Sequence, residues 1–124
     1  PCDCVFLCSD PEDYKRTDYF AEEIINCFYF AGFAFSKFHI LDNRNQDKAA
    51  DLVNGANLLL LAGGHVPTQN QFFAKIHLKN LLQPFQGVLV GISAGSMNCA
   101  EIVYAHPELE GEATDPMFQK YLRL

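Results

Sequence analysis

The chain has little positive charge and no cluster of basic residues. It carries nine Lys and Arg residues against fifteen Asp and Glu residues, which gives a formal net charge of −6 at pH 7. Proteins bind nucleic acids and anionic membrane surfaces through concentrated positive charge. The composition therefore argues against nucleic acid and membrane as partners and leaves a small soluble substrate or peptide open.

Long apolar runs are also missing, and no basic segment followed by an apolar one opens the chain. The apolar run at residues 58–62 is far too short to span a bilayer. These absences predict a cytoplasmic protein. With 124 residues, of which 49% are hydrophobic, the sequence is long and apolar enough for one domain with its own core.

Five cysteines are present, an odd number without the spacing of a disulfide framework. Cys2, Cys4 and Cys8 share one parity in a predicted strand, where same-face neighbours lie roughly 6.6 Å apart, too far for two thiolates to bind one zinc ion without a bend. We therefore expect buried, reduced thiols rather than a metal site. Cys27 and Cys99 fall in predicted helices and are expected to be packing residues. Because the sequence has no phosphate loop or metal-ligand cluster, no cofactor is expected.

Strand-like and helix-like segments alternate along the chain. Short apolar runs predict strands at residues 4–8, 35–41, 57–62 and 88–91. Helical spacing predicts helices at residues 15–33, 46–54, 68–83 and 94–104. The alternation is typical of a single α/β domain over residues 1–124, in which helices flank a parallel sheet in three layers. We expect the second strand near the sheet edge and the third in its centre.

The same pattern predicts which side chains cap the helices. Thr17 or Asp18 is the expected N-cap of the first helix, and Asn45 that of the second. Thr68 and Gln71 fit a capping box that would open the third helix.

The most informative stretch is residues 88–97, in which Ser93 stands between Gly91 and Gly95 in the pattern G-x-S-x-G. An apolar run precedes this pattern and a helix-compatible segment follows it, as in a nucleophile elbow. The sharp turn of such an elbow needs small residues two positions before and after the nucleophile, which Gly91 and Gly95 supply. The arrangement predicts a catalytic Ser93 whose hydroxyl projects at the carboxyl edge of the sheet.

A glycine pair, Gly63 and Gly64, ends the third predicted strand. Because the carboxyl ends of parallel strands meet at one edge, this loop is expected beside the elbow. The backbone N–H groups of Gly64 and Ala94 are the predicted oxyanion hole. Found together at the ends of consecutive strands, the two glycine patterns favour catalysis over two unrelated turns.

Four histidines are candidates for the base that Ser93 would need. His65 lies on the same predicted edge, where it either lines the pocket and binds substrate or, as the less favoured interpretation, acts as the base. His106 is less plausible because the elbow helix would carry it roughly 16 Å away. His39 and His77 are expected to face solvent. The residues alone predict a nucleophile and leave its base open.

Together the two motifs resemble the peptidase E group of serine peptidases, which includes the cyanophycinases. The likeness rests on residues 59–64 (LLLAGG) and 91–96 (GISAGS) and covers residues 5–115. It is closest to a bacterial branch described as type 1 glutamine amidotransferase-like proteins, in which stretches similar to residues 63–70 and 93–98 recur. The resemblance implies the class I glutamine amidotransferase-like, flavodoxin-like fold.

The resemblance also implies a serine hydrolase that cleaves small peptides or amide bonds through an acyl-enzyme. Ser93 matches the nucleophile, and Gly64 and Ala94 match the oxyanion-hole positions. The family's catalytic histidine follows the elbow helix and a loop, beyond any match before Leu124, and its first strand and helix precede the region that begins at Val5. The chain is therefore expected to be an incomplete domain. The acidic triad member is not placed, although some members carry an acid near Glu108.

Three hypotheses follow from these residues. The first is a serine peptidase or amidase. The second is a catalytically inactive binding or regulatory module with the same fold, and the third is a truncated fragment of the enzyme. Glutamine-dependent amide transfer is not expected, because amidotransferases of this fold carry Cys at the elbow where this chain has Ser93, and Cys99 lies too far along the helix to replace it. A homo-oligomer is left open.

Overall fold

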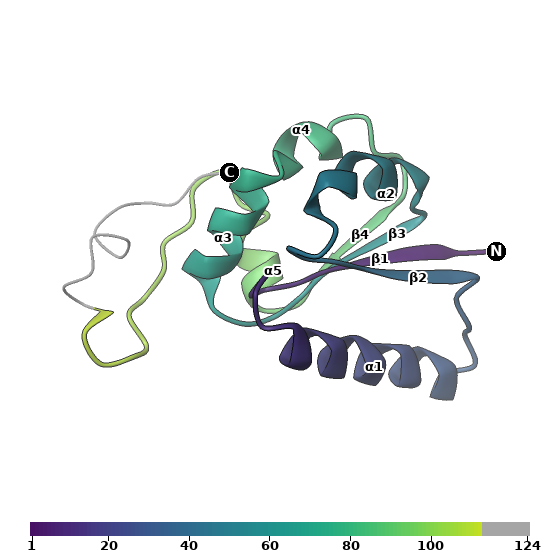
Figure 1. Cartoon of the computed structure of the whole chain (residues 1–124), viewed down its shortest axis with the longest axis horizontal. Helices are drawn as coiled ribbons and strands as arrows, with labels where there is room; N and C mark the ends of the chain where they lie inside the picture. The colour runs from purple at the N-terminus through teal and green to yellow at the C-terminus, as the bar shows by residue number, and fades with distance from the viewer. Residues whose placement is uncertain (113–124) are drawn as a thin grey trace.

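The computed structural model describes residues 1–112, in which strands and helices alternate (Figure 1). The elements in chain order are β1 (Asp3–Leu7), α1 (Tyr14–Phe30), β2 (Lys37–Leu41), the 3₁₀ turn η1 (Gln46–Lys48), α2 (Ala49–Gly55), β3 (Leu58–Leu61), α3 (Val66–Lys75), α4 (Leu78–Leu82), β4 (Val88–Gly91) and α5 (Ala94–Met97). For residues 117–124 the sequence is compatible with a last turn of helix or a loose end, and this segment lies outside the described residues.

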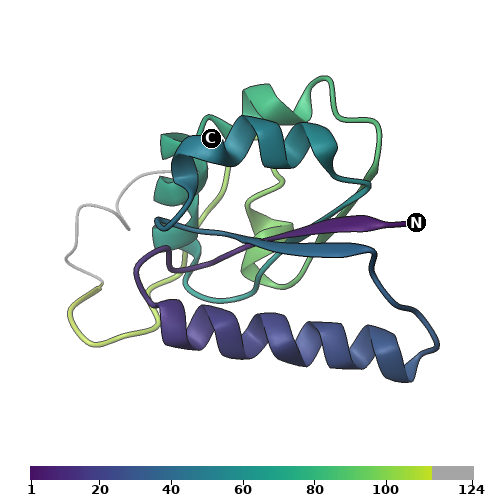
Figure 2. The same cartoon turned by 45° about the vertical axis from the view of Figure 1, so that its right-hand side comes forward.

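The four strands form one parallel sheet in the order β2-β1-β3-β4. α1 covers one face, and α2, α3 and α4 cover the other (Figures 1 and 2). The predicted α/β class, with a parallel sheet between helical layers, is confirmed, as are the edge position of β2 and the central position of β3. β3 and β4 are neighbours, so the two glycine motifs end on adjacent strands.

Both faces of the central strands β1 and β3 are buried. This explains why all residues of β3, and all residues of β1 except Asp3, are apolar. Alternate residues of these strands belong to two separate cores. The core on the α1 side contains Cys4, Phe6, Ala21, Leu58, Leu60 and Ala62. The core on the other side is built around Val5, Leu7, Leu59, Leu61, Phe72 and Phe73.

The first helix begins earlier than its predicted caps. The side chain of Asp13 caps α1 by accepting the backbone N–H of Arg16 at 3.1 Å. Thr17 lies inside the first turns and is buried, and Asp18 forms an ion pair with Arg44 at 2.6 Å. The prediction of Thr17 or Asp18 as N-cap is therefore wrong. Both side chains instead form tertiary contacts, Thr17 with the carbonyl of Asp10 and Asp18 with Arg44.

The third predicted helix is two helices, and it begins two residues early. α3 starts at Val66, with Pro67 in its first turn, where a fixed φ suits a helix. The predicted capping box at Thr68 is therefore wrong. The helix is interrupted at His77, because the left-handed backbone of this residue, with φ 54°, separates α3 from α4. Asn45 stands at the N-cap position of η1 as predicted, but its side chain makes no capping hydrogen bond, because its Oδ1 accepts the backbone N–H of Asp42 at 3.1 Å.

The elbow helix ends at Met97 instead of reaching Tyr104 as predicted. Val103 and Ala105 are buried, whereas their neighbours Ile102 and Tyr104 are exposed. This alternation with a period of two is typical of extended backbone. The β-branched and aromatic side chains of this stretch favour that conformation over a helix.

The cysteines differ in burial, and Cys2, which was expected to be buried, is only half-buried. Cys4 and Cys8 are buried as predicted, but they lie in different cores because β1 ends at Leu7. Burial raises the pKa of the Cys4 thiol to about 12. The pKa of the Cys8 thiol is also raised, mainly by burial and to a smaller extent by the carboxylates of Asp42 and Asp10. Cys27 and Cys99 are exposed, so their prediction as packing residues is wrong.

Within residues 1–112, no group of three or more His, Cys, Asp or Glu side chains is arranged to hold a metal ion. In the same part of the chain, every helix is too short or too polar to cross a membrane.

Candidate active site

Ser93 lies at the turn between β4 and α5 with φ 50° and ψ −110°. A residue other than glycine is held in such a sparsely populated region at a cost of about 1–3 kcal/mol. Backbone strain of this kind at a strand-to-helix turn is the geometry of a nucleophile elbow. The predicted strand, turn and helix around Ser93 are therefore present.

Gly91 and Gly95 are required by the backbone around them. A Cβ added to Gly91 would lie 2.6 Å from the backbone nitrogen of Ser96. A Cβ added to Gly95 would overlap the carbonyl oxygen of Leu61 in β3. The first glycine lets the elbow close on itself, and the second lets α5 lie directly against the central strand.

The glycine pair after β3 lies beside the elbow, as expected. A Cβ on Gly63 would be 3.5 Å from the Cβ of Ser93 and 3.3 Å from the carbonyl oxygen of Ile92. Gly64 has φ +149° and lies against the side chain of Ser9, at the end of β1. Ser9 was not predicted as a site residue, although its place after a parallel strand puts it on the same edge.

The two predicted oxyanion donors have no acceptor within residues 1–112. No described residue accepts a hydrogen bond from the backbone N–H of Gly64 or of Ala94. The N–H of Ala94 is free because the first amides of a helix have no partner in the helix. Both donors are thus available to a ligand, and their role as an oxyanion hole stays a prediction.

His65 is held from both sides of its ring. Its Nδ1 lies 2.7 Å from Oγ1 of Thr68, and its Nε2 lies 2.8 Å from Oε1 of Glu112. No hydrogen bond within residues 1–112 joins His65 or any other side chain to Oγ of Ser93. The ring would have to leave one of its partners before it could accept the proton of Ser93.

The other predicted candidates are all exposed to solvent. His39, His77 and His106 are exposed, as expected for the first two. Glu108 is also exposed and contributes its backbone N–H to Glu112 at 2.7 Å. Sequence reasoning missed Glu112, because nothing in the pattern of the acidic loop distinguishes one glutamate from another.

Glu112 links the loop at residues 108–112 to His65, and this link should depend on pH. Burial by itself would raise the pKa of Glu112, but bonds from the backbone N–H groups of Glu108 and Leu109 and from His65 outweigh it, so the pKa lies below the ordinary 4.5. A lowered carboxyl pKa means that the contact is present above pH 4.5 and is lost as the pH falls through the lowered value.

We expect the backbone amide signals of Glu108 and Leu109 in NMR spectra to titrate together with a midpoint below pH 4.5. Glu112→Gln should remove this titration while the signals of the sheet stay in place. A midpoint at or above 4.5, or an unchanged titration in the variant, would contradict the assignment.

A buried amide network lies behind the elbow. The side chain of Gln69 donates to the carbonyl of Ala62 at 2.7 Å, and that of Asn98 donates to Oε1 of Gln69 at 3.0 Å. Asn70 in turn donates to Oδ1 of Asn98 at 3.0 Å. All three amide side chains are buried. Sequence reasoning treated them only as motif residues, although three amides at helical core positions could have indicated a network.

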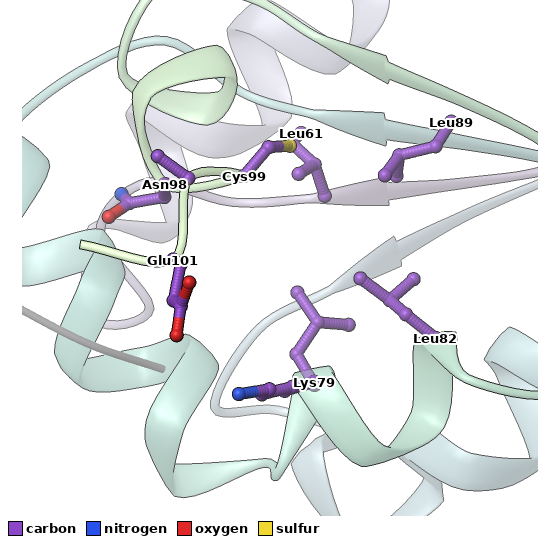
Figure 3. A pocket seen from close by; sticks show the side chains of 9 residues that line it. Leu61, Lys79, Leu82, Leu89, Asn98, Cys99 and Glu101 are labelled. Carbon is purple, nitrogen blue, oxygen red and sulfur yellow. The ribbon is translucent and has the colours of Figure 1, made fainter. Parts of the chain in front are cut away.

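Two hollows lie near these elements, on opposite faces of the sheet. The larger, of about 380 Å³, lies between α4, the strands β3 and β4, and the turn after α5 (Figure 3). It does not include Ser93 or the glycine pair. The smaller, of about 260 Å³, is lined by Gly63, Gly64 and Ile92 and so borders the elbow. Position rather than size therefore identifies the smaller hollow as part of the candidate site.

The arrangement combines a strained serine, two unpaired backbone N–H groups and an adjoining hollow at one edge of a parallel sheet. These are the parts that acyl transfer requires, apart from a base in contact with the serine. Neither a family model nor a curated protein matches the chain.

Proposed function

We propose that this chain carries the nucleophile half of a serine hydrolase that cleaves small peptides or amide bonds through an acyl-serine. The observation that carries the proposal is the backbone of Ser93, at φ 50° and ψ −110° between Gly91 and Gly95. Proteins retain strain of this kind where the surrounding structure enforces it, and such positions cluster at active sites. The resemblance to the peptidase E group leads to the same function.

In the proposed reaction, Oγ of Ser93 attacks the substrate carbonyl, and the N–H groups of Gly64 and Ala94 stabilise the oxyanion. The amine leaves with a proton, and water then releases the acyl group from Ser93. In the peptidase E group the base is a histidine that follows the elbow helix and a loop. His65 is the alternative base, provided that it is released from Thr68 or Glu112.

We also propose a specific fold for this domain. The strand order β2-β1-β3-β4 in a parallel sheet supports a class I glutamine amidotransferase-like, flavodoxin-like domain, because flavodoxin-like sheets follow the order 2-1-3-4-5. The proposal includes a cytoplasmic location and needs no cofactor.

A fluorophosphonate probe, which forms a covalent bond with activated serines, tests the proposal. We expect it to label the protein at Ser93 and labelling of Ser93→Ala to fall to background, because the variant lacks the nucleophile. Ser36→Ala is the matched control, since this serine lies near the opposite end of β1, where its Oγ accepts the backbone N–H of Cys2 at 3.1 Å. The labelled residue is identified by mass spectrometry of the digested protein.

An alternative function is a binding or regulatory module without catalysis. The observation that favours it is that both ring nitrogens of His65 are engaged and no described side chain forms a hydrogen bond with Oγ of Ser93. If the folded protein is not labelled at neutral or alkaline pH, the hydrolase proposal fails and this alternative gains support.

A further inference from the structure

The smaller hollow, of about 260 Å³, lies between α1 and the loops that follow β3 and β4. The side chains of Phe6, Phe20, Ile24 and Ile92 form its walls. Phe20 and Ile92 are 40% and 37% exposed. Apolar side chains that face water inside a concave surface indicate a site for an apolar group.

The hollow is close enough to Ser93 to hold a group of the same substrate. Ile92 precedes Ser93 in the chain, and a Cβ on Gly63 would lie 3.6 Å from Cγ2 of Ile92 and 3.5 Å from Cβ of Ser93. Its volume of about 260 Å³ is below the roughly 300–1,000 Å³ of pockets that enclose a drug-sized ligand. It therefore suits a single side chain rather than an entire ligand.

Among the residues that the structure describes, Arg16 is the one charged residue that lines this hollow. Its guanidinium carbon lies 5.5 Å from the centre of the Phe20 ring, and it forms no ion pair within residues 1–112. Asp10 and Asp13 border a small adjoining hollow, but their carboxylates accept the backbone N–H groups of Glu12 and Arg16, each at 3.1 Å. The guanidinium is thus available to an anion at the edge of an apolar pocket.

We propose that this hollow binds the leaving part of the substrate, an amino acid residue with an apolar or aromatic side chain whose free carboxylate is held by Arg16. The proposal rests on the hydrolase function above and names its substrate class. Oγ of Ser93 forms a bond to the scissile carbonyl carbon as the C–N bond breaks. The leaving nitrogen takes the proton from Ser93, and the free amino acid departs from the hollow before water hydrolyses the acyl-serine.

Phenylalanine, which has both the ring and the carboxylate, is the test ligand. Phenylalaninamide lacks the carboxylate, and alanine lacks the ring. We expect phenylalanine to shift the methyl NMR signals of Ile24 and Ile92 and to slow fluorophosphonate labelling of Ser93. Phenylalaninamide should bind about five- to tenfold more weakly, as expected for loss of a charge-assisted hydrogen bond. Alanine should produce neither effect.

Arg16→Gln tests the role of the guanidinium. In this variant phenylalanine and phenylalaninamide should bind equally, whereas Lys15→Gln, at the neighbouring exposed position that does not line the hollow, should preserve the difference. Equal binding of both ligands to the unmodified protein, or no shift at Ile24 and Ile92, would overturn the inference even if Ser93 is labelled. Binding through Arg16 without labelling of Ser93 would instead support the binding site and contradict the hydrolase proposal.

Discussion

Gly95→Ala is expected to lower the free energy of unfolding by about 3 kcal/mol or more, because it places a methyl group against backbone that cannot move aside. The new Cβ would overlap the carbonyl oxygen of Leu61 and lie 2.7 Å from its carbonyl carbon. Leu61 belongs to β3, which is hydrogen-bonded to a strand on each side. Urea denaturation followed by circular dichroism measures the change.

Gly55→Ala provides the matched control for this substitution. Gly55 ends α2, and a Cβ there would meet nothing within 4 Å. We expect its stability to change by no more than about 0.5 kcal/mol, as for surface positions without special backbone geometry. If Gly95→Ala were as stable as Gly55→Ala, α5 could not lie against β3 as described, and the position of Ser93 would have to be reconsidered.

Asn98→Ala is the second substitution with a large expected effect. It leaves Oε1 of Gln69 and Nδ2 of Asn70 without their partner in a buried region. Each buried polar group left unsatisfied costs about 1–3 kcal/mol, so for two groups we expect a loss of about 2–6 kcal/mol in the free energy of unfolding. Because Asn98 directly follows α5, labelling of Ser93 should also become slower in the folded variant.

The control for this prediction is Asn80→Ala, which removes an exposed amide from α4. We expect stability and labelling to remain near those of the unmodified protein. Equal stability of the two variants in urea would show that the amide network does not hold α3 to the turn after α5.

Residues near one another in the chain made much of the fold predictable. The apolar run at β3 and the β-branched run at β4 have few alternatives at their length, and both form strands at the predicted places. Gly91, Ser93 and Gly95 identified the strained turn because the steric demand of such a turn falls on those same positions. The catalytic role of Ser93 stays a prediction.

Helix ends were predicted less well, because several side chains compete for each cap. Thr17 and Thr68 are good capping residues, but the fold uses Thr17 in a buried turn and Thr68 beside His65. The elbow helix was predicted too long because no glycine or proline interrupts the sequence between Gly95 and Pro107. In the structure, Asn98 turns into the amide network and Val103 becomes buried in extended backbone.

The sequence by itself determined the α/β class, the parallel sheet and the elbow around Ser93, because strand length, periodicity and the steric need for glycine are local properties. Only the tertiary structure decided which polar side chains meet. His65 and Glu112 are 47 positions apart, and Gln69 and Asn98 are 29 apart. Their pairing depends on how loops and helices pack around the sheet, and the position of Arg16 beside the hollow depends on the same packing.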